Sequence, residues 1–232
     1  MKPDLSSFES PTLSLALQGY IRKTYLWMVG GLLISGFTAW FTVNTPFFGL
    51  FILNPVILFI LFFAELGLVW FLSSRIMSIE ISTASFLFVL YSFLNGLTLS
   101  LIFFVYASTT IQNVFFTTAA LFAAMSFYGY TTKRDLTSWG SFLFMGLIGI
   151  VIAIIINMFI GSSALDFAIS LIGVLIFVGL TAYDTQKIKE MFYELSENEM
   201  ALGKYSILAA LTLYLDFINL FLFLLRLFGR RE

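Results

Sequence analysis

The sequence predicts an all-α polytopic membrane protein with seven transmembrane helices. Of its 232 residues, 60% are hydrophobic and only 11% are charged, whereas a soluble domain carries roughly 25% charged residues. Seven apolar stretches each approach the ~20 residues that a helix needs to cross a ~30 Å hydrocarbon core. These stretches are continuous rather than alternating, which favours helices over the strands of a membrane barrel.

The elements follow from the apolar runs and from the polar residues between them. Residues 1–19 lack the apolar core of a secretory signal, so we expect a polar amino-terminal tail before a transmembrane domain of residues 20–232. Seven runs then form the expected spans, and the first outer loop is bracketed by Pro46 and Pro55. The spans cover residues 24–43, 55–72, 84–107, 111–130, 142–159, 167–188 and 205–228.

The distribution of Lys and Arg predicts the orientation. Basic residues flank the spans at one side only, and cytoplasmic loops are the ones enriched in Lys and Arg. We therefore expect a cytoplasmic amino terminus. The residues that define this side are Arg22, Lys23, Arg75, Lys133, Arg134, Lys187, Lys189 and Lys204.

The basic carboxyl terminus conflicts with this orientation. Seven crossings place Arg226, Arg230 and Arg231 on the far side, and a re-entrant seventh segment after six spans is the alternative. We favour seven, because the last run measures ~36 Å at 1.5 Å per residue.

Composition also limits the chemistry. Without cysteine or histidine, the chain lacks thiol nucleophiles, thiolate metal sites, and the commonest zinc ligand and general base. No P-loop is present, so ATP-driven pumping by this chain is not expected. We expect no enzymatic activity, no bound cofactor and no nucleic-acid partner. The expected surroundings are the lipid bilayer.

Acidic residues within the apolar runs are the strongest functional signal. Asp216 lies near the middle of the seventh run, Asp184 near the end of the sixth, and Glu65 inside the second. A charged side chain at a helix centre costs at least ~2.5 kcal/mol on insertion scales, so it usually faces a cavity, a partner or an ion path. Two neighbouring carboxylates would share a proton, and after losing it they could offer oxygen ligands to calcium.

Each of these residues also has a plainer interpretation. Asp184 could be an interfacial residue beside Lys187, Glu65 a protonated acid bonded to a neighbouring helix, and Arg75 a snorkelling anchor. Counting from Lys187 and Lys204, the helical rise places Asp184 and Asp216 at depths that differ by about 13 Å. Tilt, a vestibule, or a helix that continues past Lys204 would be needed to bring them together.

Four stretches resemble the Bax inhibitor-1 family, in its bacterial inner-membrane branch. They are Arg22–Gly31, Gly129–Leu136, Gly179-Leu-Thr-Ala-Tyr-Asp-Thr-Gln186 and Leu211-Thr-Leu-Tyr-Leu-Asp-Phe-Ile-Asn-Leu220. The resemblance implies a bundle with the seventh helix at its centre. It also implies that Asp184 and Asp216 form a hydrogen-bonded pair that senses pH and controls a calcium leak. Glu65 and Arg75, matched by helix position only, would be accessory groups of the same pathway.

Two functions are therefore weighed. The first is a pH-sensitive calcium leak in the inner membrane, gated by the Asp184/Asp216 pair, which would bind calcium transiently while protons compete for it. The alternative is a regulatory membrane protein that binds a membrane-bound protease or another membrane partner through its cytoplasmic segments.

Overall fold

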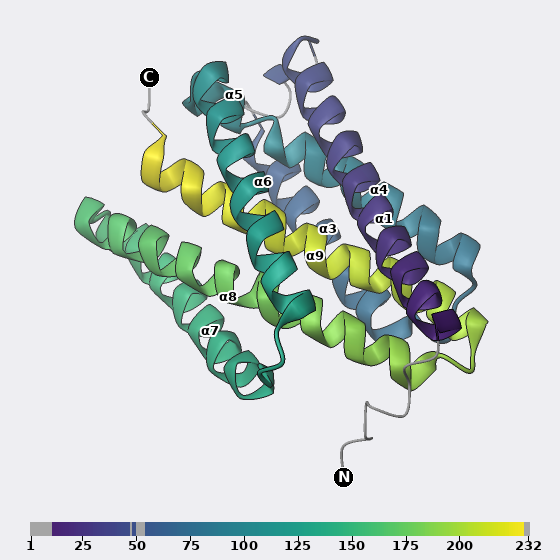
Figure 1. The fold of residues 1–232 in the computed structure, drawn as a ribbon. Helices are drawn as coiled ribbons and strands as arrows, with labels where there is room; N and C mark the ends of the chain where they lie inside the picture. The colour runs from purple at the N-terminus through teal and green to yellow at the C-terminus, as the bar shows by residue number, and fades with distance from the viewer. Residues whose placement is uncertain (1–10, 47, 50–53, 230–232) are drawn as a thin grey trace.

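In the computed structural model, residues 11–46, 48–49 and 54–229 are described, and long helices dominate these segments (Figure 1). Within these described segments, seven helices are long and apolar enough to span a membrane, which confirms the predicted fold class. The helices are α1 (Pro11–Val43), α3 (Pro55–Arg75), α4 (Ile81–Leu99), α5 (Ile102–Val105), α6 (Ser108–Thr131), α7 (Thr137–Ile160), α8 (Ser163–Leu195) and α9 (Glu199–Phe228).

The helix boundaries follow local signals. Asn54 caps the start of α3 by accepting a hydrogen bond from the Val56 amide, and Pro55 occupies the first turn, where its missing N–H is not needed. Gly161 ends α7 with a φ of 66°, a left-handed conformation that glycine adopts without strain. The third span is formed jointly by α4 and the short α5.

Helix α9 is the centre of the bundle. Within its most apolar window 72% of residues are buried, compared with 11% for α7. The helices packed against α9 are α1, α3, α4, α6 and α8, whereas α7 packs against α8 on the outside (Figure 1). A fully apolar outer helix such as α7 suits a lipid environment, because lipid can cover the surface that protein leaves exposed.

Three helices extend well beyond the apolar runs that predicted them. Helix α8 continues to Leu195 and α9 begins at Glu199, so Lys187, Lys189 and Lys204 lie on helices rather than in a long loop. Helix α1 begins at Pro11, within the segment expected to be a polar tail, and residues 1–10 lie outside the described part of the chain. The basic residues Arg230 and Arg231 also lie outside it.

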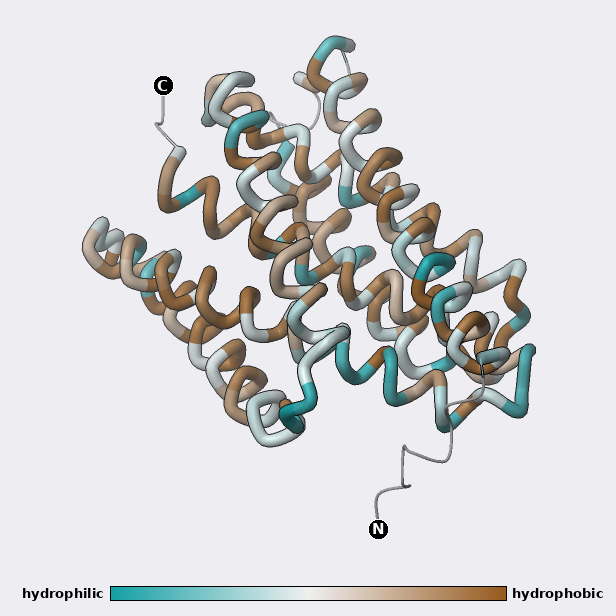
Figure 2. Tube along the Cα trace, viewed as in Figure 1, coloured by the Kyte–Doolittle hydropathy of each residue, from teal (hydrophilic) through white to brown (hydrophobic). Residues whose placement is uncertain are grey.

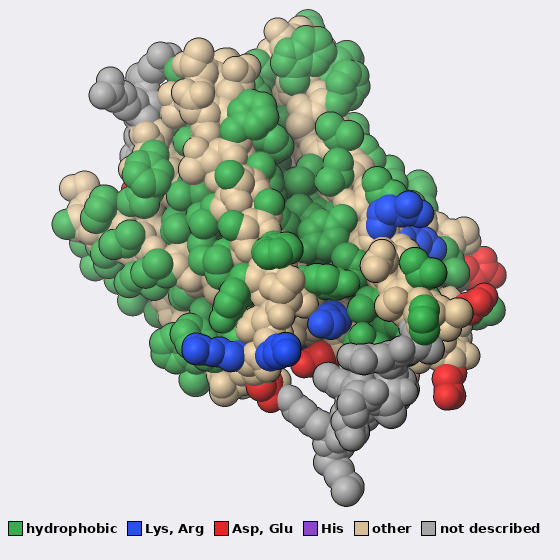
Figure 3. Space-filling model, in the orientation of Figure 1, with side chains coloured by type: hydrophobic (Ala, Val, Ile, Leu, Met, Phe, Trp, Pro, Cys, Tyr) green, Lys and Arg blue, Asp and Glu red, His purple; other side chains and the backbone are tan. Residues whose placement is uncertain are grey.

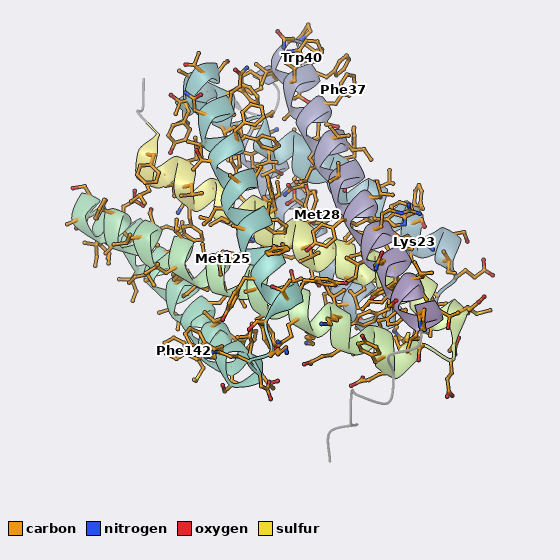
Figure 4. The ribbon with its side chains drawn as sticks, in the orientation of Figure 1. Lys23, Met28, Phe37, Trp40, Met125 and Phe142 are labelled. Atoms are coloured by element: carbon orange, nitrogen blue, oxygen red, sulfur yellow. The ribbon has the colours of Figure 1, made fainter. Side chains whose placement is uncertain are left out.

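Polar and basic residues gather at one end of the bundle, which we call the basic end. Figure 2 shows hydrophilic residues where α8 ends and α9 begins, and Figure 3 shows Lys and Arg side chains along the lower part of the same view. The basic end comprises the start of α1, the ends of α3, α6 and α8, and the starts of α4, α7 and α9. In Figure 4, Trp40 lies near the end of α1 that is remote from the basic end, and Lys23 lies on the half of α1 nearer to the basic end.

Small residues allow the inner helices to approach closely. A Cβ atom on Gly96 of α4 would lie 2.7 Å from the Ser35 carbonyl oxygen of α1, and one on Gly31 would meet the Phe88 ring at 2.7 Å. A Cβ on Gly129 of α6 would overlap the backbone of Ala182 on α8. Such close approaches at small residues are typical of membrane helix packing, in which van der Waals contact takes the place of the hydrophobic effect as the driving force.

Candidate functional site

The structure brings the two predicted aspartates together. Asp184 of α8 and Asp216 of α9 are joined by a hydrogen bond between their side chains. A carboxylate has no donor, so two carboxyl groups can form this bond only when one of them carries a proton. This bond between α8 and α9, which pack extensively on each other, therefore requires at least one proton on the pair.

The helices that carry the two aspartates continue beyond the lysines. The expected depth difference of about 13 Å assumed polar boundaries at Lys187 and Lys204. Since α8 runs to Leu195 and α9 starts at Glu199, those lysines do not mark the ends of the helices. The continuation of α9 past Lys204, one of the explanations allowed by the sequence, is what the structure contains.

The surroundings of the pair are asymmetric. Asp216 is only 4% exposed, whereas Asp184 is partly exposed. Lys187 and Tyr205 lie close enough to Asp184 for electrostatic interaction. Thr185, the next residue of α8, shares a 3.3 Å hydrogen bond with Tyr25 of α1. Asp184 thus faces the polar, basic end of the bundle, and Asp216 faces its interior.

One oxygen of the pair has no partner. The Oδ2 atom of Asp216 is buried and accepts no hydrogen bond from the described residues. Buried polar atoms are nearly always bonded, and an exception calls for a physical or functional reason. An unpaired carboxyl oxygen beside a second carboxyl group is a hard oxygen ligand that a small cation or a water molecule can use.

The pair does not resemble a resident metal site. Among the described residues, no group of three or more acidic, histidine or cysteine side chains gathers around a common point. A calcium ion takes six to eight oxygen ligands, whereas the two carboxyl groups together supply at most four. Two grooves in the surface, of about 280 and 400 Å³, include neither aspartate in their linings.

Glu65 belongs to a separate polar cluster. Its side chain is 9% exposed and accepts hydrogen bonds from Thr98 Oγ1 at 2.5 Å and from Asn95 Nδ2 at 3.2 Å. This geometry matches the plainer interpretation, in which the acid is bonded to a neighbouring helix, here α4. Asn95 in turn accepts a 2.8 Å hydrogen bond from the hydroxyl of Tyr214 on α9.

Arg75 lies apart from both acid clusters. It is exposed at the end of α3, where its backbone carbonyl accepts hydrogen bonds from the Ser78 and Ile79 amides. The groups that act on the two aspartates are each other and Lys187, not Arg75. The position of Arg75 suits a topological anchor.

Sequence reasoning missed two polar residues near these acids. Tyr214 is fully buried and bonds to both Ser35 and Asn95; a polar side chain two residues before Asp216 on an apolar helix was the available signal. Gln186, two residues after Asp184, accepts a hydrogen bond from the Leu136 amide and donates one to the Arg134 carbonyl, both at 2.8 Å. It thereby fixes the α6–α7 turn on α8.

Comparisons with known proteins identify the family. The family model described as "Inhibitor of apoptosis-promoting Bax1" matches residues 17–232. The chain is 52% identical over 218 residues to the inner membrane protein YbhL of Escherichia coli (strain K12), covering 93% of each chain. It is 45% identical over 214 residues to a Borreliella burgdorferi protein, covering 92% of each chain. A Deinococcus radiodurans protein is 39% identical over 213 residues, which cover 92% of this chain and 91% of that protein. Together with its seven spans, these matches establish that the chain is a membrane protein of the Bax inhibitor-1 family.

Proposed function

We propose that the chain is a passive, pH-sensitive pathway for calcium, controlled by the hydrogen-bonded pair of Asp184 and Asp216. The observation that carries this proposal is the meeting of two carboxyl groups inside a membrane bundle, with one buried oxygen left unpaired. Acidic groups within spans usually belong to ion or proton pathways, because their burial is costly.

A proton and a calcium ion compete for the same oxygens in this proposal. While the proton is shared, the two carboxyl groups bind each other and hold α8 against α9. Loss of the proton leaves two negative charges that repel, and a divalent cation can then replace the proton between them. Permeation requires such binding to be transient, which agrees with a site of two acidic ligands rather than a full coordination shell.

Opening of the pathway by a movement of α9 against α8 is part of the proposal. At Gly173 of α8, the atoms nearest to an added Cβ belong to the side chain of Phe223 on α9 and not to the α9 backbone. Side chains can change rotamer when two packed helices shift, which is how such a contact can take two discrete arrangements. The surface grooves of about 280 and 400 Å³ do not include the pair in their linings.

The proposed activity needs no bond-breaking chemistry, no cofactor and no energy source in the chain. Flux would follow the calcium gradient. We accordingly propose that the protein is not an enzyme, in keeping with its lack of cysteine and histidine.

Calcium flux into proteoliposomes, measured from below to above neutral pH, tests the proposal. Asp184→Asn and Asp216→Asn should each abolish the pH dependence, because an amide neither releases a proton nor offers a charged ligand. Glu190→Gln removes one charge from an exposed position of α8 and is the matched control. If both aspartate variants keep the parent's flux and pH profile, the proposal is wrong.

Deletion of residues 1–10, which precede α1, separates the calcium pathway from the regulatory alternative. A pathway formed by the helices keeps its flux without the amino-terminal segment. A regulator that binds a membrane partner through this segment should lose that binding, which pull-down from membranes would measure. Loss of flux together with intact partner binding would contradict both functions.

We also propose that the basic end faces the cytoplasm, on the strength of its Lys and Arg residues. The chain has no cysteine, so single introduced cysteines give an unambiguous readout. Lys133→Cys should resist a membrane-impermeant thiol reagent in intact cells, and Ser162→Cys should react. The opposite labelling pattern would reverse the orientation.

A further inference from the structure

Tyr214 and Asp216 lie at nearly the same level of α9 but on opposite faces. Two residues along an α-helix are separated by about 200°, since each residue turns the helix by about 100°. Asp216 faces α8 through Asp184. Tyr214 faces α1 and α4 through Ser35 and Asn95. The central helix therefore bonds to the acid Asp184 on one face and to a chain of polar side chains on the other.

This polar chain consists of five groups in series, and it begins at a buried acid and ends at a backbone carbonyl. Glu65 of α3 bonds to Asn95 of α4 at 3.2 Å, and Asn95 bonds to Tyr214 of α9 at 2.8 Å. Tyr214 bonds to Ser35 of α1 at 2.6 Å, and Ser35 lies 2.7 Å from the Ser92 carbonyl oxygen. Four helices are joined by hydrogen bonds whose members are all buried.

The donors and acceptors of the chain can be ordered in two ways. When Glu65 is ionised it can only accept, so Asn95 donates to it and Tyr214 donates to Asn95. Ser35 then donates to Tyr214, and its single proton is no longer available to the Ser92 and Gly31 carbonyls. When Glu65 is protonated it donates to the Asn95 oxygen after a half-turn of the amide. The Asn95 nitrogen then donates to Tyr214, and Tyr214 donates to Ser35, whose own proton bonds to the Ser92 carbonyl. Each hydroxyl has only one proton, so the direction of the first bond sets the direction of the bonds among Asn95, Tyr214 and Ser35.

We propose that Glu65 is a second proton-binding site, and that its protonation reverses every hydrogen bond of the chain from Glu65 to Ser35. The consequence for α9 is specific. With Glu65 ionised, the Tyr214 hydroxyl donates toward α4, and with Glu65 protonated it donates toward α1. The central helix thereby responds to protons on both faces. This inference concerns proton binding alone and does not depend on the proposed calcium pathway.

The surroundings of Glu65 suit this role. The helices packed against α3 are α4 and α9, and their titratable groups near Glu65 are Tyr91 and Tyr214. Among the described residues, the side chains that bond to Glu65 are the neutral Thr98 and Asn95. Since no cation in that set fixes the acid in its ionised form, both orders of the chain remain available.

Infrared difference spectroscopy of the purified full-length protein during a pH titration tests the proposal. The titration would run from about pH 4 to about pH 9, a range that includes the titration of ordinary and of raised carboxyl groups. The natural chain should show a buried carboxylic-acid band and a tyrosine C–O band that change at the same pH. Glu65→Gln, whose amide donates as the protonated acid does, should lose both changes. Tyr214→Phe should keep the acid band and lose the tyrosine change.

Three controls make the result decisive. Tyr91→Phe removes the hydroxyl of a ring that packs edge-on against Tyr214 outside the chain and should keep both bands. The double variant Asp184→Asn with Asp216→Asn should keep them as well, so failure of the calcium pathway and failure of this proposal are distinguishable. A tyrosine change that survives in Glu65→Gln, or the absence of any acid band sensitive to this substitution, overturns the proposal. Unchanged circular dichroism would show that each variant is folded.

Discussion

The two faces of α9 hold polar groups in opposite ways. On the α8 face, Asp184 and Asp216 share a hydrogen bond, and the Oδ2 atom of Asp216 has no partner among the described residues. On the α1 and α4 face, Ser35, Asn95 and Tyr214 form an uninterrupted chain to Glu65. One face is under-bonded and the other is fully bonded.

This difference indicates that the fully bonded face serves stability and that the aspartate face serves function. A complete buried network specifies one packing, because breaking any member leaves another without its partner. An incomplete one costs stability and persists where the unused bonding capacity serves a purpose. We therefore expect substitutions on the α4 face to unfold the bundle more readily, and substitutions of the aspartates to change flux while leaving the fold intact.

The largest effect on stability is expected for Asn95→Leu. This change fills a similar volume but removes one hydrogen bond from Glu65 and one from Tyr214, which leaves them bonded to Thr98 and to Ser35 alone. We expect a loss of about 2–3 kcal/mol, since an unsatisfied buried polar group costs about 1–3 kcal/mol. Unfolding in mixed micelles with increasing denaturing detergent measures it. Asn113→Leu, at an exposed position of α6, is the control and should change stability by less than about 0.5 kcal/mol.

Two glycine-to-alanine substitutions compare how tightly the helices pack on the two faces of α9. Gly96→Ala drives a methyl group against the Ser35 backbone, where α1 and α4 cannot move apart without breaking the Tyr214 chain. We expect a loss of about 1–2 kcal/mol, because overpacking costs about 1–3 kcal/mol. Gly173→Ala places a methyl group 2.6–2.7 Å from the Cγ, Cδ1 and Cε1 atoms of Phe223. The whole Phe223 side chain must shift, but no backbone atom is among these three neighbours, and the better helix propensity of alanine offsets part of the cost, so we expect a smaller loss than for Gly96→Ala. Equal losses for the two variants would show that the α8 face is as rigid as the α4 face.

The sequence predicted the seven spans because continuous apolar runs leave little choice inside a bilayer. It did not predict where helices end outside those runs. Polar residues after Lys187 form helix as readily as loop, and the extension of α8 to Leu195 depends on contacts that no local pattern reveals. The expected depth difference between the aspartates assumed helix boundaries at Lys187 and Lys204, and those boundaries were wrong for the same reason.

The candidate site was only partly predictable. Glu65 and Asp216 are conspicuous because acids are rare in apolar runs, and the pairing of Asp184 with Asp216 was suggested by family resemblance rather than by spacing. Ser35 and Tyr214 are separated by 179 positions, and Asn95 and Tyr214 by 119. Hydroxyl and amide groups in apolar helices have many possible partners, so only the packed bundle identifies which of them bond.

A smaller effect on stability is expected for Asp216→Asn. The new amide can donate to Asp184, so the bond between α8 and α9 persists without a shared proton. We expect the free energy of unfolding to change by less than about 1 kcal/mol, in either direction. The same detergent unfolding assay measures it, beside Asn95→Leu. A loss as large as that of Asn95→Leu would mean that the aspartate pair is mainly structural, and the two faces of α9 would then not differ in role.

The smallest effect is expected at the turn beside Asp184. Gln186→Leu removes the two hydrogen bonds that fix the α6–α7 turn, while Lys189 still donates to the Tyr130 carbonyl at 3.1 Å. Hydrogen exchange followed by mass spectrometry should show faster exchange at the Leu136 amide, whose acceptor is lost. Global stability should stay within about 1 kcal/mol, because the turn lies at the end of the helices. If the turn also restrains the aspartate face, this variant should shift the pH profile of calcium flux, whereas an unchanged profile confines its role to local order.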